Sequence, residues 1–125
     1  MKIAVIIVRI LVGLMFLFAS ITYFFNLIPV PEMTGKMKTF NEGLAASGYI
    51  VTVVKTFELL CGIAFVSGRF VPLAVVVIFP IAVNIVLVHA FLAPEGLPIA
   101  IPLFLGILFL AYAHREKYAP LFASK

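Results

Sequence analysis

The 125-residue sequence has few residues of the kinds that soluble enzymes use for chemistry. Its single cysteine, Cys61, excludes an internal disulfide, a CxxC redox pair and a cysteine-based metal cluster. It has no aspartate to ligate a cation, no glycine-rich phosphate loop and no Ser/His/Asp arrangement. We therefore assign no catalytic residue and no metal site, and we do not expect the chain to be a complete enzyme on its own.

Charged residues are also scarce, at 11% of the chain, whereas 65% is hydrophobic and the mean hydropathy is +1.27. A soluble domain has about 45–50% apolar and about 25% charged residues. A chain this short could not bury so much apolar surface in water, so the excess must face lipid. We expect residues 1–125 to form one transmembrane domain. The net charge of +4 does not indicate a nucleic-acid partner, because the basic residues lie at the ends of the apolar runs.

Four apolar runs, at about residues 3–28, 49–67, 71–92 and 97–114, each approach the roughly 20 residues that a spanning helix needs. None alternates apolar and polar residues as the strands of a membrane barrel do. The first run is too long for a signal-peptide core and contains Arg9, so we expect a retained helix. The sequence predicts an all-α integral membrane protein, a four-helix transmembrane bundle.

The basic residues favour one orientation of this bundle. The N-terminus, the second loop and the C-terminus would lie on one side, and the first loop would lie on the other. Basic residues concentrate on the cytoplasmic side of membrane proteins, so we expect both termini in the cytoplasm. The first side has Lys2, Arg9, Arg69, Arg115, Lys117 and Lys125, and the first loop has Lys36 and Lys38.

The first loop, about residues 29–48, is the one substantial segment between the predicted spans. Met33, Met37, Phe40 and Leu44 recur in it at helical spacing, opposite Glu42 and the two lysines. This pattern predicts a short amphipathic helix that lies on the outer membrane surface. A plain tether is the alternative.

Several polar residues lie within the spans, where charge is costly and usually functional. Lys55 and Glu58 are three residues apart on one helix face, where they can form an ion pair. Glu58 would lie about 13 Å below the outer end of its helix and Asn84 about 12 Å below the same surface. With Asn26 and His89, they predict a polar chamber in the outer half of the bilayer, a candidate ligand-binding or proton site. The alternatives are a packing role for the polar groups and an interfacial position for His89.

Motifs along nearly the whole chain resemble those of the DoxX-like family of small membrane proteins. They are the segment RILVGLMFLFAS from Arg9, ASGY at 46–49, ELLCG from Glu58, GRF at 68–70, PIAVN from Pro80, His89 and the pair His114–Arg115. The resemblance implies a four-helix transmembrane bundle in a bacterial cytoplasmic (inner) membrane. It also implies links to quinone-coupled sulfur oxidation, terminal oxidases and oxidative-stress complexes. Glu58, Asn84 and His89 match the polar pattern of the family.

These observations favour a small subunit or accessory protein of a membrane redox complex, quinone-linked or respiratory. Its partners would be membrane lipid and either other subunits of that complex or further copies of the chain. Quinone is the one cofactor that the resemblance suggests. Two alternatives stay open: a small-molecule or proton-coupled carrier, and a structural or assembly factor without a ligand.

Overall fold

The computed structural model describes residues 2–27 and 33–123, and every regular element in these two ranges is helical. The predicted all-α fold is confirmed. The long helices are α1 (Lys2–Phe25), α2 (Gly35–Ala46), α3 (Ile50–Ser67), α4 (Val71–Phe91) and α5 (Leu97–Ala113). The short ones are η1 (Pro94–Gly96), α6 (Arg115–Tyr118) and η2 (Ala119–Phe122). Ile28, where we expected the first span to end, and Pro29 lie outside the described residues.

Four helical segments are long and apolar enough to cross a membrane: α1, α3, α4 and the joined η1–α5 segment. Between 22% and 28% of the most apolar window of each segment is buried within the protein. Most of these apolar side chains therefore face outward, as lipid-facing residues of a small bundle must. The predicted transmembrane bundle is confirmed by this arrangement.

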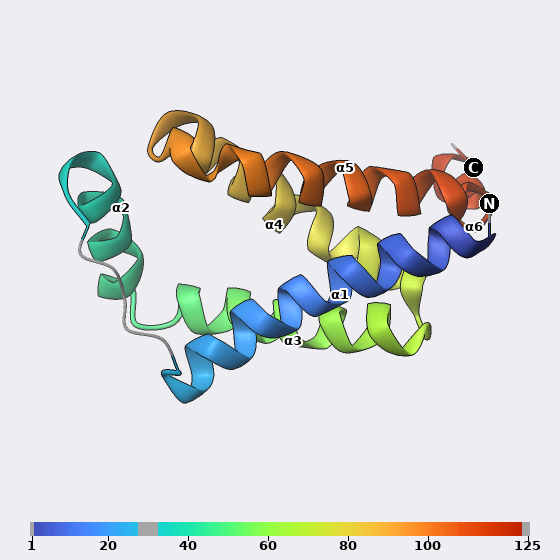
Figure 1. The fold of residues 1–125 in the computed structure, drawn as a ribbon, viewed down its shortest axis with the longest axis horizontal. Helices are drawn as coiled ribbons and strands as arrows, with labels where there is room; N and C mark the ends of the chain where they lie inside the picture. The colour runs from blue at the N-terminus through green and yellow to red at the C-terminus, as the bar shows by residue number, and fades with distance from the viewer. Residues whose placement is uncertain (1, 28–32, 124–125) are drawn as a thin grey trace.

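The four spans contact one another in a ring, in the order α1, α3, α4, α5 and back to α1. The closest pairing is between α1 and α3. In Figure 1, α1 and α5 meet at the end of the bundle where both termini lie, and they diverge toward the other end. The two ends of the bundle thus differ, because α1 and α5 approach each other near the termini and α2 lies at the far end.

The buried core lies mainly in the half of the bundle near the termini. Its largest fully buried side chains include Phe16, Phe65, Ile78, Ile107 and Leu110. Phe16 of α1 and Phe65 of α3 stack with ring centroids 6.5 Å apart. Aromatic pairs of this kind contribute about 0.5–1.5 kcal/mol beyond the area that they bury.

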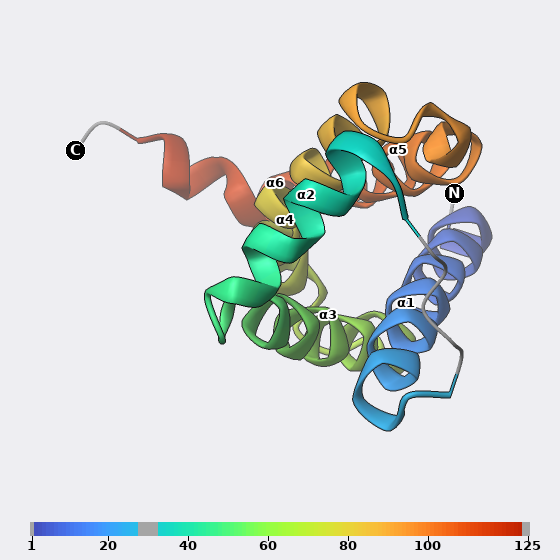
Figure 2. The same cartoon turned by 90° about the vertical axis from the view of Figure 1, so that its left-hand side faces the viewer.

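The helix α2 lies within the loop for which we predicted an amphipathic helix, and it crosses the end of the bundle opposite the termini (Figure 2). None of its residues is buried. The segment ends with Gly48, whose φ of +80° is left-handed and suits a glycine. Within this loop the structure describes residues from Met33 onward, and α2 begins at Gly35.

Candidate functional site

Lys55 and Glu58 form an ion pair on α3, with 3.5 Å between Lys55 Nζ and Glu58 Oε2. The Glu58 side chain is 5% exposed, whereas that of Lys55 is 25% exposed. The carboxylate is therefore held inside the protein, and the ammonium group reaches toward its surface. Glu58 is one of two buried polar residues in the described part of the chain, the other being Ser20.

The backbone of its own helix satisfies Ser20, whereas Glu58 depends on the Lys55 side chain. The Ser20 hydroxyl donates to the carbonyl of Phe16 on its own helix, over 2.7 Å, which is a common way to satisfy a serine in an apolar helix. A buried carboxylate gains nothing comparable from its helix, because the carbonyls there accept hydrogen bonds and do not donate them. The burial of Glu58 within a span therefore requires an explanation beyond its own helix backbone.

Asn84 lies on the surface of α4, and its amide donates to the carbonyl of Pro80 over 3.0 Å. The amide thus bonds within its own helix, one turn back. Within the described residues it makes no hydrogen bond with Lys55 or Glu58. Pro80 and Asn84 together form a local unit on an exposed face of α4.

His89 lies near the end of α4, against the short helix η1. Its Nδ1 is 2.7 Å from the carbonyl oxygen of Ile85. Its ring fills the space that a side chain at Gly96 would need. The ring therefore packs α4 against the connection to α5, and the hydrogen bond to Ile85 fixes its orientation.

Asn26 has a backbone role at the end of α1. Its φ of 52° is left-handed, and its N–H bonds to the carbonyl of Tyr23. The N–H of Leu27 bonds to the carbonyl of Thr22. This pair of hydrogen bonds is the Schellman motif, in which asparagine is one of the few residues that tolerate the left-handed position. Its side chain is exposed.

A hydrogen bond that the sequence analysis missed joins α1 to α3. The hydroxyl groups of Tyr23 and Thr52 are 3.1 Å apart. A threonine in an apolar helix gives no sign of which helix it faces, so the sequence offered no direct signal. Thr52 precedes Lys55 by three residues, so this bond lies on the same side of α3, nearer the α2 end.

The structure thus brings together two of the five candidate residues, Lys55 and Glu58. Asn26, Asn84 and His89 each have a local explanation, and the predicted chamber that would unite all five stays a prediction. In the described ranges, no three histidine, cysteine or acidic side chains come close enough to hold a metal ion.

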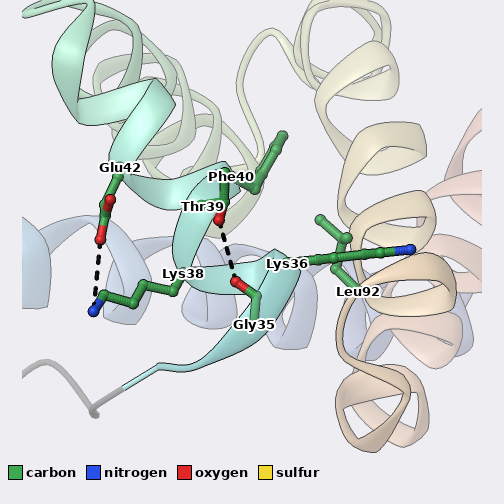
Figure 3. A pocket seen from close by; sticks show the side chains of 7 residues that line it. All are labelled: Gly35, Lys36, Lys38, Thr39, Phe40, Glu42 and Leu92. Carbon is green, nitrogen blue, oxygen red and sulfur yellow. Dashed lines mark hydrogen bonds and ion pairs between the residues drawn. The ribbon is translucent and has the colours of Figure 1, made fainter.

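A cavity of about 810 Å³ lies between α2 and the end of α4 (Figure 3). Lys36 extends across it toward Leu92, while Lys38 and Glu42 pair on the outer side of α2. The cavity is open and has a cationic wall. It is lined by Gly35, Lys36, Lys38, Thr39, Phe40, Glu42 and Leu92, and so by none of the five candidates.

Comparison with known proteins supports the resemblance drawn from the motifs. A sequence model described as DoxX matches residues 4–90, which include α2, α3 and nearly all of α1 and α4. The matched range contains all five candidate residues. Comparison with curated proteins and with solved structures finds no match.

Proposed function

Because the chain belongs to the DoxX family of membrane proteins, we propose that it is a small subunit or accessory protein of a quinone-linked or respiratory redox complex. The observation that carries this proposal is the buried Glu58 carboxylate, paired with a lysine that reaches the protein surface. Ionisable groups inside a membrane span are expensive and usually serve a ligand or a proton.

A packing role explains this ion pair less well than a ligand does. Lys55 and Glu58 both belong to α3, so their attraction does not hold two helices together. Interhelical polar bonds are the ones that stabilise membrane bundles. Replacing both residues by apolar ones would remove the cost of burying charge, which is often neutral or stabilising. A buried ion pair that joins no helices is therefore better explained by a function than by packing.

The pair suits a quinone in two respects. The Lys55 ammonium group is a donor that a quinone carbonyl can accept from, and it lies where a ligand in the bilayer can reach it. Glu58 is a carboxyl group within reach of the same ammonium and can exchange a proton with a ligand held there. Apolar side chains of α3 supply the rest of such a site, in the usual proportion of few polar groups to many apolar ones.

Binding of a quinone analogue tests the proposal, with the purified full chain in detergent or nanodiscs. We expect Glu58→Gln to weaken binding at least tenfold, because it removes the anion that holds Lys55 in place. Glu42→Gln is the matched control, since Glu42 pairs with Lys38 on the exposed α2. Equal affinity in the wild type and Glu58→Gln would remove the pair from the site. Failure of the wild type to bind any analogue, or to co-purify with redox subunits, would overturn the function.

We also propose that the protein lies in a bacterial inner membrane with both termini in the cytoplasm. Both termini and the connection between α3 and α4 lie at one end of the bundle, and α2 lies at the other (Figure 1). Most lysine and arginine residues belong to the first end, as the positive-inside rule requires of a cytoplasmic face.

Cysteine labelling in intact cells tests this orientation, because Cys61 is the single cysteine of the chain and is buried. In a Cys61→Ala background, a membrane-impermeant maleimide should label Lys38→Cys and not Lys117→Cys. Labelling of Lys117→Cys alone would reverse the orientation. Both variants should react after the membrane is permeabilised.

A further inference from the structure

A second cavity, of about 420 Å³, lies at the end of the bundle near the termini. It falls between the first turns of α1 and the junction of α5 with α6, at the end of the bundle where α1 and α5 meet (Figure 1). Its volume is within the range of about 300–1,000 Å³ that small-molecule sites occupy. It is lined by Lys2, Val5, Ile6, Ala113, His114 and Arg115.

The polar side chains of the described residues that line this cavity are Lys2, His114 and Arg115, and none of them is acidic. Within the described residues, neither Lys2 nor Arg115 lies within ion-pair distance of a carboxylate, since the two ion pairs found there involve other lysines. Glu116 follows Arg115 in the chain but does not line the cavity. An anion in the cavity would therefore meet two uncompensated cations.

Arg115 is held in position for such an anion. Its guanidinium group lies over the Tyr112 ring, 4.4 Å from the ring centroid, and its Nη1 donates to the Tyr112 carbonyl over 3.0 Å. These contacts use one face and one donor of the group, so most of its N–H donors stay free. A guanidinium group that is already ordered loses little freedom when it binds a phosphate.

The floor of the cavity is apolar and continues onto the outer surface of the bundle. Val5, Ile6 and Ala113 form it. Ile6 and Tyr112 are both exposed, at 45% and 58%, on helices that span the membrane. The cations at the end of the spans suit the phosphate of a phospholipid, and the apolar side chains next to them suit its acyl chains.

We propose that this cavity binds an anionic phospholipid, whose phosphate group lies between Lys2 and Arg115 and whose acyl chain follows Ile6. Basic pockets between transmembrane helices bind lipid headgroups of this kind. Charge-assisted hydrogen bonds from the guanidinium group would fix the phosphate. A free phosphate ion would use the same two cations but would gain nothing from the apolar floor. The site is independent of the Lys55–Glu58 pair and of the proposed redox role.

Binding of defined lipids to the purified full chain in detergent tests this site, by native mass spectrometry and by thermal stabilisation. The probes are phosphatidylglycerol, phosphatidylcholine and inorganic phosphate. We expect phosphatidylglycerol to bind and raise the unfolding temperature, and the other two to have little effect. Equal stabilisation by inorganic phosphate would identify a free-anion site and overturn the lipid proposal.

Matched charge variants separate the cavity from the general attraction of anionic lipid to basic residues. Lys2→Gln with Arg115→Gln removes both cavity cations, whose side chains are exposed. Arg69→Gln with Lys117→Gln removes two cations from the same end of the bundle but outside the cavity. We expect the first pair to weaken phosphatidylglycerol binding about 10- to 30-fold and the second less than about threefold. Equal weakening by the two pairs would overturn the proposal.

Discussion

Gly62 of α3 lies directly against the backbone of Gly13 in α1. A Cβ atom at position 62 would be 3.1 Å from the Gly13 carbonyl oxygen and 2.9 Å from the Leu17 side chain. One at position 13 would be 2.9 Å from the Cβ of Phe65. Small residues at a helix interface let two backbones approach closely, which is how membrane helices gain packing energy in the absence of a hydrophobic drive.

We predict that Gly62→Ala destabilises the bundle by about 1–3 kcal/mol, because its methyl group meets a backbone atom that cannot move aside. Thermal unfolding in detergent measures the change. Gly43→Ala on α2 is the control, since a Cβ there has no described atom within 4 Å. That substitution should be neutral or stabilise α2 by up to about 1 kcal/mol. Equal stability of the Gly62→Ala variant and the wild type would mean that α1 and α3 are not so closely packed.

The close approach of Gly13 and Gly62 illustrates what the sequence alone does not determine. The four spans could be predicted because length and hydrophobicity define them. The face of each span that points into the bundle could not be predicted. Nearly every residue of α4 and α5 is apolar, so no polar stripe marks the outer side. Asn84 was therefore placed with Glu58 by depth alone, although it lies on an exposed face of α4.

Asn26 has a role in the backbone that its residue type alone does not reveal. The amide side chain drew attention, whereas the left-handed φ of 52° gives the residue its place. A signal was present in the sequence: an asparagine followed within three residues by Pro29 is typical of a helix end.

The contact between His89 and Gly96 leads to a second prediction. Gly96→Ala should destabilise the protein, because its methyl group would occupy the space of the His89 ring. His89→Ala should relieve this conflict, so that the double variant is more stable than the sum of the single changes predicts. A coupling energy of about 0.5–3 kcal/mol is expected for two residues in direct contact. Additive effects in a thermal-unfolding cycle would contradict the packing of His89 against η1.

The Lys55–Glu58 pair leads to a third prediction. Lys55→Met leaves the Glu58 carboxylate buried without a partner, and breaking a buried ion pair in this way costs about 3–5 kcal/mol. Lys55→Met combined with Glu58→Leu should recover most of that stability, because no charge is then left in the span. Thermal unfolding of the wild type, of Lys55→Met and of the double variant measures this recovery. Lys38→Met is the control, because its partner Glu42 is exposed and the loss should be below about 1 kcal/mol.

The stability of the double variant also separates function from structure. If it is stable and has lost quinone binding, the pair serves the ligand. If it is stable and binds as well as the wild type, the pair is dispensable for both, and the ligand lies elsewhere. A double variant that is as unstable as Lys55→Met would indicate that the unpaired Glu58 carboxylate does not cause the loss of stability.

Tyr118 ties the C-terminal segment to the bundle and gives a pH-dependent prediction. Its hydroxyl donates to the Pro72 carbonyl at the start of α4 over 2.8 Å, and burial raises the pKa of Tyr118 above its ordinary value of 10.0. The hydrogen bond should contribute about 0.5–1.5 kcal/mol. Because the folded state holds the proton more tightly, this contribution is complete below the unfolded pKa and is lost as the pH rises through the folded pKa. The stability difference between wild type and Tyr118→Phe should therefore be constant from pH 7 to about pH 9.5 and shrink above about pH 10.

Tyr112→Phe, which removes an exposed hydroxyl without a hydrogen bond in the described residues, should show no such difference at any pH. A difference between wild type and Tyr118→Phe that persists unchanged at high pH would mean that the hydroxyl does not donate to Pro72.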